Sequence, residues 1–78
     1  MTRPVKRSFS IEGHRTSVSL ESAFWTALKE AADEDGISLA RLIARIDNDR
    51  GSAGLSSAVR VWLLTRYRQS AAAIAPKK

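Results

Sequence analysis

The fold is decided by the stretch RTSVSLESAFWTALKEAADEDGISLARLIARI, residues 15–46. It opens with six residues, 15–20, in which polar and apolar side chains alternate toward the end. This alternation is the period of a β-strand with two unlike faces. Beyond Leu20 the apolar side chains recur every three or four residues, which is the period of an amphipathic helix. The stretch therefore predicts a short strand followed by helices, with its core positions at Val18, Leu20, Phe24, Trp25, Leu28, Leu42, Ile43 and Ile46.

Capping and turn residues divide the chain further. Gly36 is placed to end a first helix, and Ser38 can cap a second one. A turn-rich segment with two glycines, 47–54, ends the second helix, and Ser56 or Ser57 can cap a third. The buried stripe of the third helix is expected to be Val59, Trp62, Leu63 and Tyr67. The predicted organisation is a flexible basic leader at 1–7, one domain at 8–73 with a strand at about 15–20 and helices at about 22–35, 38–48 and 56–73, and a flexible tail at 74–78.

The alternation extends back to Ser8, but its phase changes on the way. Phe9 and Ile11 are apolar at odd positions, whereas Val18 and Leu20 are apolar at even positions. One continuous strand cannot bring all four to the same face, so we expect a bulge, bend or turn at residues 12–14, where Gly13 gives the backbone its freedom.

Composition limits the classes of function. The 78 residues include no cysteine and one histidine, which leaves no disulfide, no metal cluster and no evident cofactor site. A chain of this length buries a marginal core, so we expect it to oligomerise. No apolar run is long enough to span a membrane and no signal peptide is evident, so the sequence favours a cytoplasmic protein. The net charge of +5 resides in basic ends around an acidic segment, 21–36, a distribution that suits a nucleic-acid partner.

A solitary strand needs a partner for its backbone hydrogen bonds. A second copy of residues 15–20 is the simplest partner, and it would give a homodimer with an antiparallel two-stranded ribbon. Its outward face would present Arg15, Ser17 and Ser19, and a ribbon of this width fits the major groove of DNA. The same side chains could instead be a merely solvated strand face.

With these parts in place, the chain resembles the ribbon-helix-helix family of DNA-binding proteins, the Arc- and MetJ-like repressors. The match runs from Arg15 to about Ile46, and its most specific part is the turn Gly36-Ile37-Ser38 between two helices. Taken whole, the chain is similar to a poorly characterised bacterial branch with a leader like residues 7–15 and a segment like 55–58. The resemblance implies a mainly α-helical fold with one short β-strand per chain, an intersubunit two-stranded antiparallel ribbon and an added third helix.

The resemblance also implies the roles of the candidate site residues. Base reading passes to Arg15, Ser17 and Ser19, which gives sequence-specific binding of double-stranded DNA by a homodimer, typical of a transcriptional regulator. Phosphate contacts pass to Ser38 and Leu39 at the start of the second helix, with Arg41 close enough to assist. From their charge alone, Lys6 and Arg7 are either a solvated tail or a basic arm that contacts the DNA backbone. Trp62 is expected in the core or dimer contact.

Two other functions stay open, and one class is disfavoured. The fold, or its third helix, could bind a protein partner as a dimeric protein-protein interaction module without physiological DNA binding. The basic residues Arg60, Arg66 and Arg68 beside Trp62 could serve DNA binding or protein binding. It could also be an antitoxin, since some family members carry a toxin-binding C-terminal segment. A catalytic role is not expected, because one histidine, His14, cannot assemble the base and orienting groups that a nucleophile needs.

Overall fold

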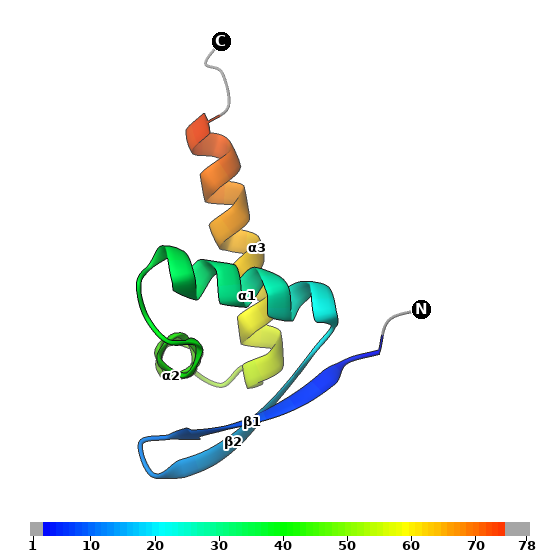
Figure 1. Cartoon of the computed structure of the whole chain (residues 1–78), viewed down its shortest axis with the longest axis vertical. Coiled ribbons are helices and arrows are strands. Elements are labelled where there is room, and N and C mark those ends of the chain that lie inside the picture. The colour runs from blue at the N-terminus through cyan, green and yellow to red at the C-terminus, as the bar shows by residue number, and fades with distance from the viewer. Residues whose placement is uncertain (1–2, 75–78) are drawn as a thin grey trace.

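The computed structural model describes residues 3–74. Two strands, β1 (Val5–Ile11) and β2 (His14–Leu20), precede three helices, α1 (Ser22–Glu34), α2 (Leu39–Asp49) and α3 (Leu55–Ile74). In Figure 1 the two strands form a hairpin at one end of the molecule, the helices gather beside it, and α3 projects from the opposite end.

The hairpin corrects the prediction of one strand per chain. β1 pairs antiparallel with β2, from Val5 opposite Leu20 to Ile11 opposite His14. The connecting residues, Glu12 and Gly13, both have positive φ, 49° and 81°, as a type I′ turn requires. The expected break at residues 12–14 is therefore a tight turn. The two-stranded ribbon is formed within one chain, and the expectation that β2 lacks a partner of its own is wrong.

The turn resolves the change of phase in the sequence. Reversal of the chain places Ile11 and Phe9 of β1 on the same face as Val18 and Leu20 of β2, and this face packs toward the helices. β1 also takes in residues 5–7, so this part of the predicted flexible leader is ordered strand. Residues 1–2 of the leader and 75–78 of the predicted tail lie outside the described residues.

The helix boundaries follow from local chemistry. Gly36, with φ of 67°, follows the end of α1 in the left-handed conformation expected of it. Ser38 is the N-cap of α2, where its hydroxyl accepts a hydrogen bond from the backbone N–H of Arg41 at 3.1 Å. α3 begins at Leu55, two or three residues before the start that a cap at Ser56 or Ser57 would give, and the hydroxyl of Ser56 bonds to the hairpin instead.

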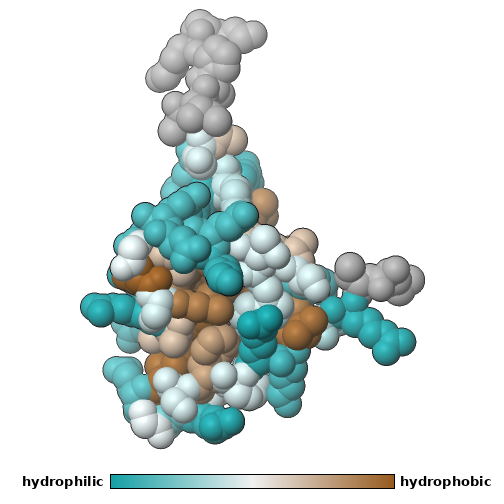
Figure 2. All heavy atoms as spheres, in the orientation of Figure 1, coloured by the Kyte–Doolittle hydropathy of each residue, from teal (hydrophilic) through white to brown (hydrophobic). Residues whose placement is uncertain are grey.

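One core joins the hairpin to all three helices. Trp62 and Phe24 are half-buried at its margin, and Tyr67, predicted to be buried, is 48% exposed. Figure 2 shows apolar surface in the middle of the molecule, over α1 and α2, bordered by hydrophilic residues. No described helix has the length and apolar character needed to cross a membrane. The buried side chains are Ile11, Val18, Leu20, Trp25, Leu28, Ala31, Ala32, Leu42, Ile43, Ile46, Leu55, Val59 and Leu63.

Candidate nucleic-acid interface

The outer face of the hairpin is polar along its whole length. Strand alternation places six side chains on the face opposite the core, and none of them is acidic or apolar. The hydroxyls of Ser8 and Ser17 lie opposite each other at 3.4 Å, and five of the six residues are exposed while Ser19 is half-buried. These residues, the outer face from here on, are Lys6, Ser8, Ser10, Arg15, Ser17 and Ser19.

Two cations sit at opposite ends of this outer face. Register pairs Arg15 with Ser10 near the turn, and Lys6 with Ser19 near the helices. Within residues 3–74 neither cation forms an ion pair with a carboxylate. The structure thus brings the predicted base-reading residues into one surface with Lys6, Ser8 and Ser10. Lys6 is a predicted phosphate contact, whereas the sequence predicts no role for Ser8 or Ser10.

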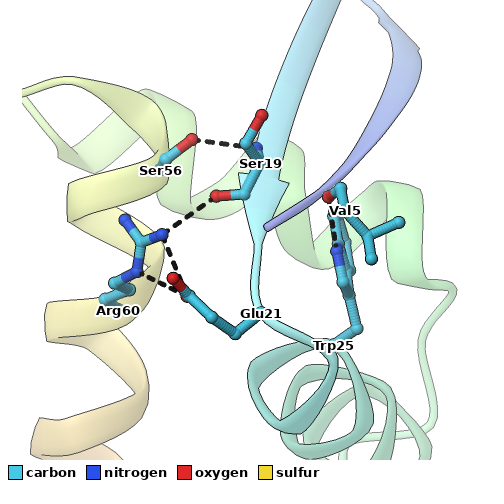
Figure 3. A network of polar contacts seen from close by, with 6 residues as sticks. All are labelled: Val5, Ser19, Glu21, Trp25, Ser56 and Arg60. Carbon is cyan, nitrogen blue, oxygen red and sulfur yellow. Dashed lines mark hydrogen bonds and ion pairs between the residues drawn. The ribbon is translucent and has the colours of Figure 1, made fainter. Parts of the chain in front are cut away.

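The backbone of Ser19 is held by α3, as Figure 3 shows. Its N–H donates to the hydroxyl of Ser56 at 3.0 Å, and its carbonyl accepts from Arg60 Nη2 at 3.2 Å. Arg60 also pairs with the carboxylate of Glu21 at 3.0 Å. A backbone hydrogen bond at Glu21 and the Arg60 guanidinium hold the pKa of the Glu21 carboxyl below its usual range. These contacts fix the base of the hairpin to the start of α3.

β1 is attached from the other side by α1. The indole Nε1–H of Trp25 donates to the carbonyl of Val5 at 2.9 Å (Figure 3), and the Trp25 ring lies 6.0 Å from that of Phe9. The guanidinium of Arg7 lies 5.2 Å above the same indole. Arg7 therefore faces the helices and not the outer face, so the predicted basic arm is divided: Lys6 lies on one side of β1 and Arg7 on the other.

A small hollow of about 140 Å³ lies at the start of α2. Its lining includes Leu39, the first residue of α2, together with Arg7 and Lys29. At the first turn of α2, the N–H of Arg41 donates to the Ser38 hydroxyl and the N–H of Leu42 donates to the Ser38 carbonyl. Among the described residues, the amides of Leu39 and Ala40 have no acceptor. Free amides at a helix start favour an anion. The structure thus brings Arg7 to the same hollow as Leu39, one of the predicted phosphate residues, whereas Ser38 is not part of its lining.

Lys29 is the residue at this hollow that sequence reasoning missed. It is the single basic residue within the acidic segment 21–36, where five carboxylates outweigh its charge. Its position on α1, one turn beyond Trp25, was a usable signal, because residues four apart on a helix lie on one face. Arg41 is exposed on α2, outside the lining of the hollow.

Two of the three cations of α3, Arg60 and Arg66, pair with carboxylates within the chain. Arg66 binds Glu34 at 2.9 Å and Asp35 at 3.0 Å, and it lies 5.4 Å above the ring of Trp62. The Arg66 hydrogen bond is the main reason that the pKa of the Asp35 carboxyl is lowered. The acidic end of α1 is therefore partly neutralised by α3.

The remaining predicted residues lie in the core or at the turn. Val18, Leu20, Trp25, Leu28, Leu42, Ile43 and Ile46 are buried within the chain, so each packs against its own helices and strands in this single copy. His14 is exposed beside the turn. No group of three or more metal-binding side chains occurs in the described part of the chain.

Comparison with known proteins agrees with this geometry. Residues 4–67 match the ribbon-helix-helix domain. Among solved structures, an uncharacterized protein from Bordetella pertussis Tohama I is similar, with 34% sequence identity and a TM-score of 0.79. The match covers 96% of this chain and 64% of that protein, so the chain spans less than two thirds of its structural relative. A search of the curated proteins finds no match.

Proposed function

Because the chain belongs to the ribbon-helix-helix domain family, whose members generally bind DNA as dimers, we propose that it binds double-stranded DNA sequence-specifically as a homodimer. Its role would be that of a transcriptional regulator in the bacterial cytoplasm. The observation that carries the proposal is the outer face of the hairpin, which combines two cations, four serines and no carboxylate.

Base reading belongs to this face. The major groove of B-form DNA admits a two-stranded ribbon, and the hairpin of one chain already has that width. Arg15 would read guanine through O6 and N7, the commonest specific contact, because its planar fork matches both acceptors. Ser17 and Ser19 can pair with several bases, so they would discriminate less. The anchoring of Ser19 by Ser56 and Arg60 supports a rigid presentation of these side chains.

Phosphate contacts would flank the ribbon at the hollow beside α2. The free amides of Leu39 and Ala40 favour a phosphate oxygen, and Arg7 and Lys29 add positive charge at the same place. Ser38 would act through its cap, which fixes the first turn of α2, and Lys6 would contact the backbone from the outer face. Arg41 would assist from the exposed side of α2.

Pairing between two chains through their strands would have to use a strand edge that is still open. In a hairpin with a two-residue turn, the backbone groups of Arg15, Ser17 and Ser19 point away from β1. Ser56 and Arg60 occupy those of Ser19, so β2 is open only at Arg15 and Ser17. A strand-paired homodimer would use this short edge or the outer edge of β1.

The test is a selection of bound duplexes from a random pool at two ionic strengths, followed by titration of the selected site. We expect one preferred sequence and a fall in affinity of roughly a thousandfold or more between 50 and 200 mM salt if six to ten phosphates are contacted. Arg15→Ala should cost about 1–3 kcal/mol and relax the preference at one base position.

Two variants separate base reading from charge. Arg15→Lys keeps the charge but loses the planar fork, so it should retain binding to random duplexes and lose the preference. Lys6→Ala should weaken binding to all sequences alike and lower the salt slope by about one. If Arg15→Ala binds the preferred site as tightly as the parent, the base-reading role is wrong.

The second candidate function is a dimeric protein-protein interaction module, and the exposed apolar residues of α3 favour it. Val61, Leu64 and Tyr67 are large and solvent-facing, whereas Arg60 and Arg66 are occupied by carboxylates. A salt slope near zero for duplex binding, or no binding at low salt, would favour this candidate over DNA recognition.

A further inference from the structure

The exposed side of α3 carries an apolar ridge between two apolar hollows. Val61, Leu64 and Tyr67 are 61%, 57% and 48% exposed. They are spaced three residues apart and therefore form one ridge along the helix. We define these three residues as the α3 ridge.

A hollow lies on each side of the ridge. One, of about 410 Å³, lies between α3 and α1 and is lined by Phe24, Ala27 and Leu64 among others. The other, of about 370 Å³, lies between α3 and the end of α2 and is lined by Ile46, Ala58 and Trp62 among others. Val61 lines both hollows, so ridge and hollows form one continuous apolar strip across three helices. Apolar strips of this kind on a small protein mark contact sites.

We infer that this strip is a contact between two copies of the chain, in which α3 packs antiparallel against α3 of the second copy. The spacing of the ridge supports a twofold arrangement. Val61 and Tyr67 lie three residues before and after Leu64. A twofold axis at Leu64 therefore sets Leu64 against its equivalent and Val61 against the Tyr67 position of the other copy. That operation brings the same apolar face of the two copies together, as an isologous contact requires.

The charges around the strip favour a second copy over a polyanion or an acidic protein. Arg60 is paired with Glu21, and Arg66 is paired with Glu34 and Asp35. Of the described cations on α3, Arg68 alone forms no ion pair, and its long side chain can keep its charge in water while the stem covers apolar surface. The strip therefore offers little free positive charge to an anionic partner, and self-association can bury its apolar area while Arg60 and Arg66 keep their carboxylate partners.

The projection of α3 gives the contact the length it needs. The helix has 20 residues, about 30 Å, and Figure 1 shows its C-terminal half extending beyond the other helices. Two such helices, together with the α1 surface at Phe24 and Ala27, can therefore meet along an extended contact. The contact uses none of the hairpin residues, so it can exist together with strand pairing or DNA binding.

The first test is the mass of the assembly by sedimentation, at low and at 1 M salt. We expect the parent to be a dimer or a larger assembly that persists at high salt, because apolar contacts are not screened. Leu64→Glu should halve its mass, and Leu64→Ala should weaken association by roughly a hundredfold or more, since two leucines leave each interface. Gln69→Glu adds the same charge at an exposed site off the ridge and should change nothing.

Circular dichroism of each variant confirms that it is folded, so that a loss of mass reports the contact. A monomeric parent, or a folded Leu64→Glu with the mass of the parent, overturns the inference. The chain has no cysteine, which makes a covalent test unambiguous. Leu64→Cys should form a disulfide-linked dimer on mild oxidation while Gln69→Cys should not, and equal cross-linking of the two would also overturn it. Neither readout involves DNA, so loss of the α3 contact is measured separately from duplex binding by the hairpin.

Discussion

The indole of Trp25 joins β1 to α1, and Trp25→Phe removes this hydrogen bond while keeping an aromatic ring in place. Trp25 is 6% exposed, and its Nε1–H donates to the carbonyl of Val5. The same ring packs near Phe9 and beneath the guanidinium of Arg7. A phenylalanine retains part of both ring contacts and loses the donor.

The expected cost follows from these contacts. A neutral hydrogen bond contributes about 1 kcal/mol net, and Val5 is 41% exposed, so water can satisfy its carbonyl and no larger penalty arises. The smaller ring buries less apolar surface, which costs about 1 kcal/mol more. The sum of about 2 kcal/mol corresponds to a fall in Tm of about 10 °C for a domain of this size.

Urea denaturation followed by circular dichroism measures the loss, and hydrogen exchange of residues 5–11 locates it. Trp62→Phe is the matched control, because Trp62 is half-buried and its Nε1–H has no acceptor among the described residues. We expect Trp25→Phe to cost about 1 kcal/mol more than Trp62→Phe and to speed exchange in β1. Equal costs with unchanged exchange in β1 would refute the anchoring role of the hydrogen bond.

Two further predictions concern the turn and the acidic end of α1. Gly13→Ala should destabilise the fold by about 1–2 kcal/mol, because φ of 81° is strained for alanine although no atom lies near the added Cβ. Glu12→Asn should stabilise the fold, because asparagine is favoured at the positive φ of this turn position. Urea midpoints of the two variants check the opposite signs. Arg66 lowers the pKa of Asp35, so this pair stabilises the fold fully above the unfolded carboxyl value of about 3.9 and its contribution is lost as the pH falls through the lower folded value. Urea midpoints between pH 6 and pH 2 should therefore fall less steeply in Arg66→Gln than in the parent, and parallel curves would contradict the pairing.

The change of phase between Ile11 and Val18 was enough to predict a break in the chain, but not a hairpin. Arg7 obscured the strand before the break, because a cation at an inward position interrupts the apolar alternation of β1. The structure accommodates Arg7 by stacking its guanidinium on Trp25, a contact between residues far apart in sequence. The two-residue spacing of Glu12 and Gly13 between two alternating segments was the signal that could have identified the hairpin.

The helices were predictable because their signals are local. Ser38 and Gly36 act within a few residues of their own positions, and the structure has both as expected. The sequence predicts a cap at Ser56, but the Ser56 hydroxyl accepts from the N–H of Ser19, 37 residues earlier, and no local pattern contains this contact. The helical spacing predicts a buried Tyr67, which lies instead on the exposed side of α3. The predicted roles of the outer-face residues stay predictions until binding is measured.

The hydrogen bonds of Ser56 and Arg60 to the backbone of Ser19 also limit aggregation through the edge of β2. A two-stranded hairpin has an open row of backbone groups on each side, and such rows can recruit strands from other molecules into growing sheets. α3 closes one row at the base of β2, so the chain cannot extend its sheet along the whole of that side. Loss of α3 by proteolysis or truncation would expose this row together with Val18 and Leu20, and would favour the addition of strands from other molecules.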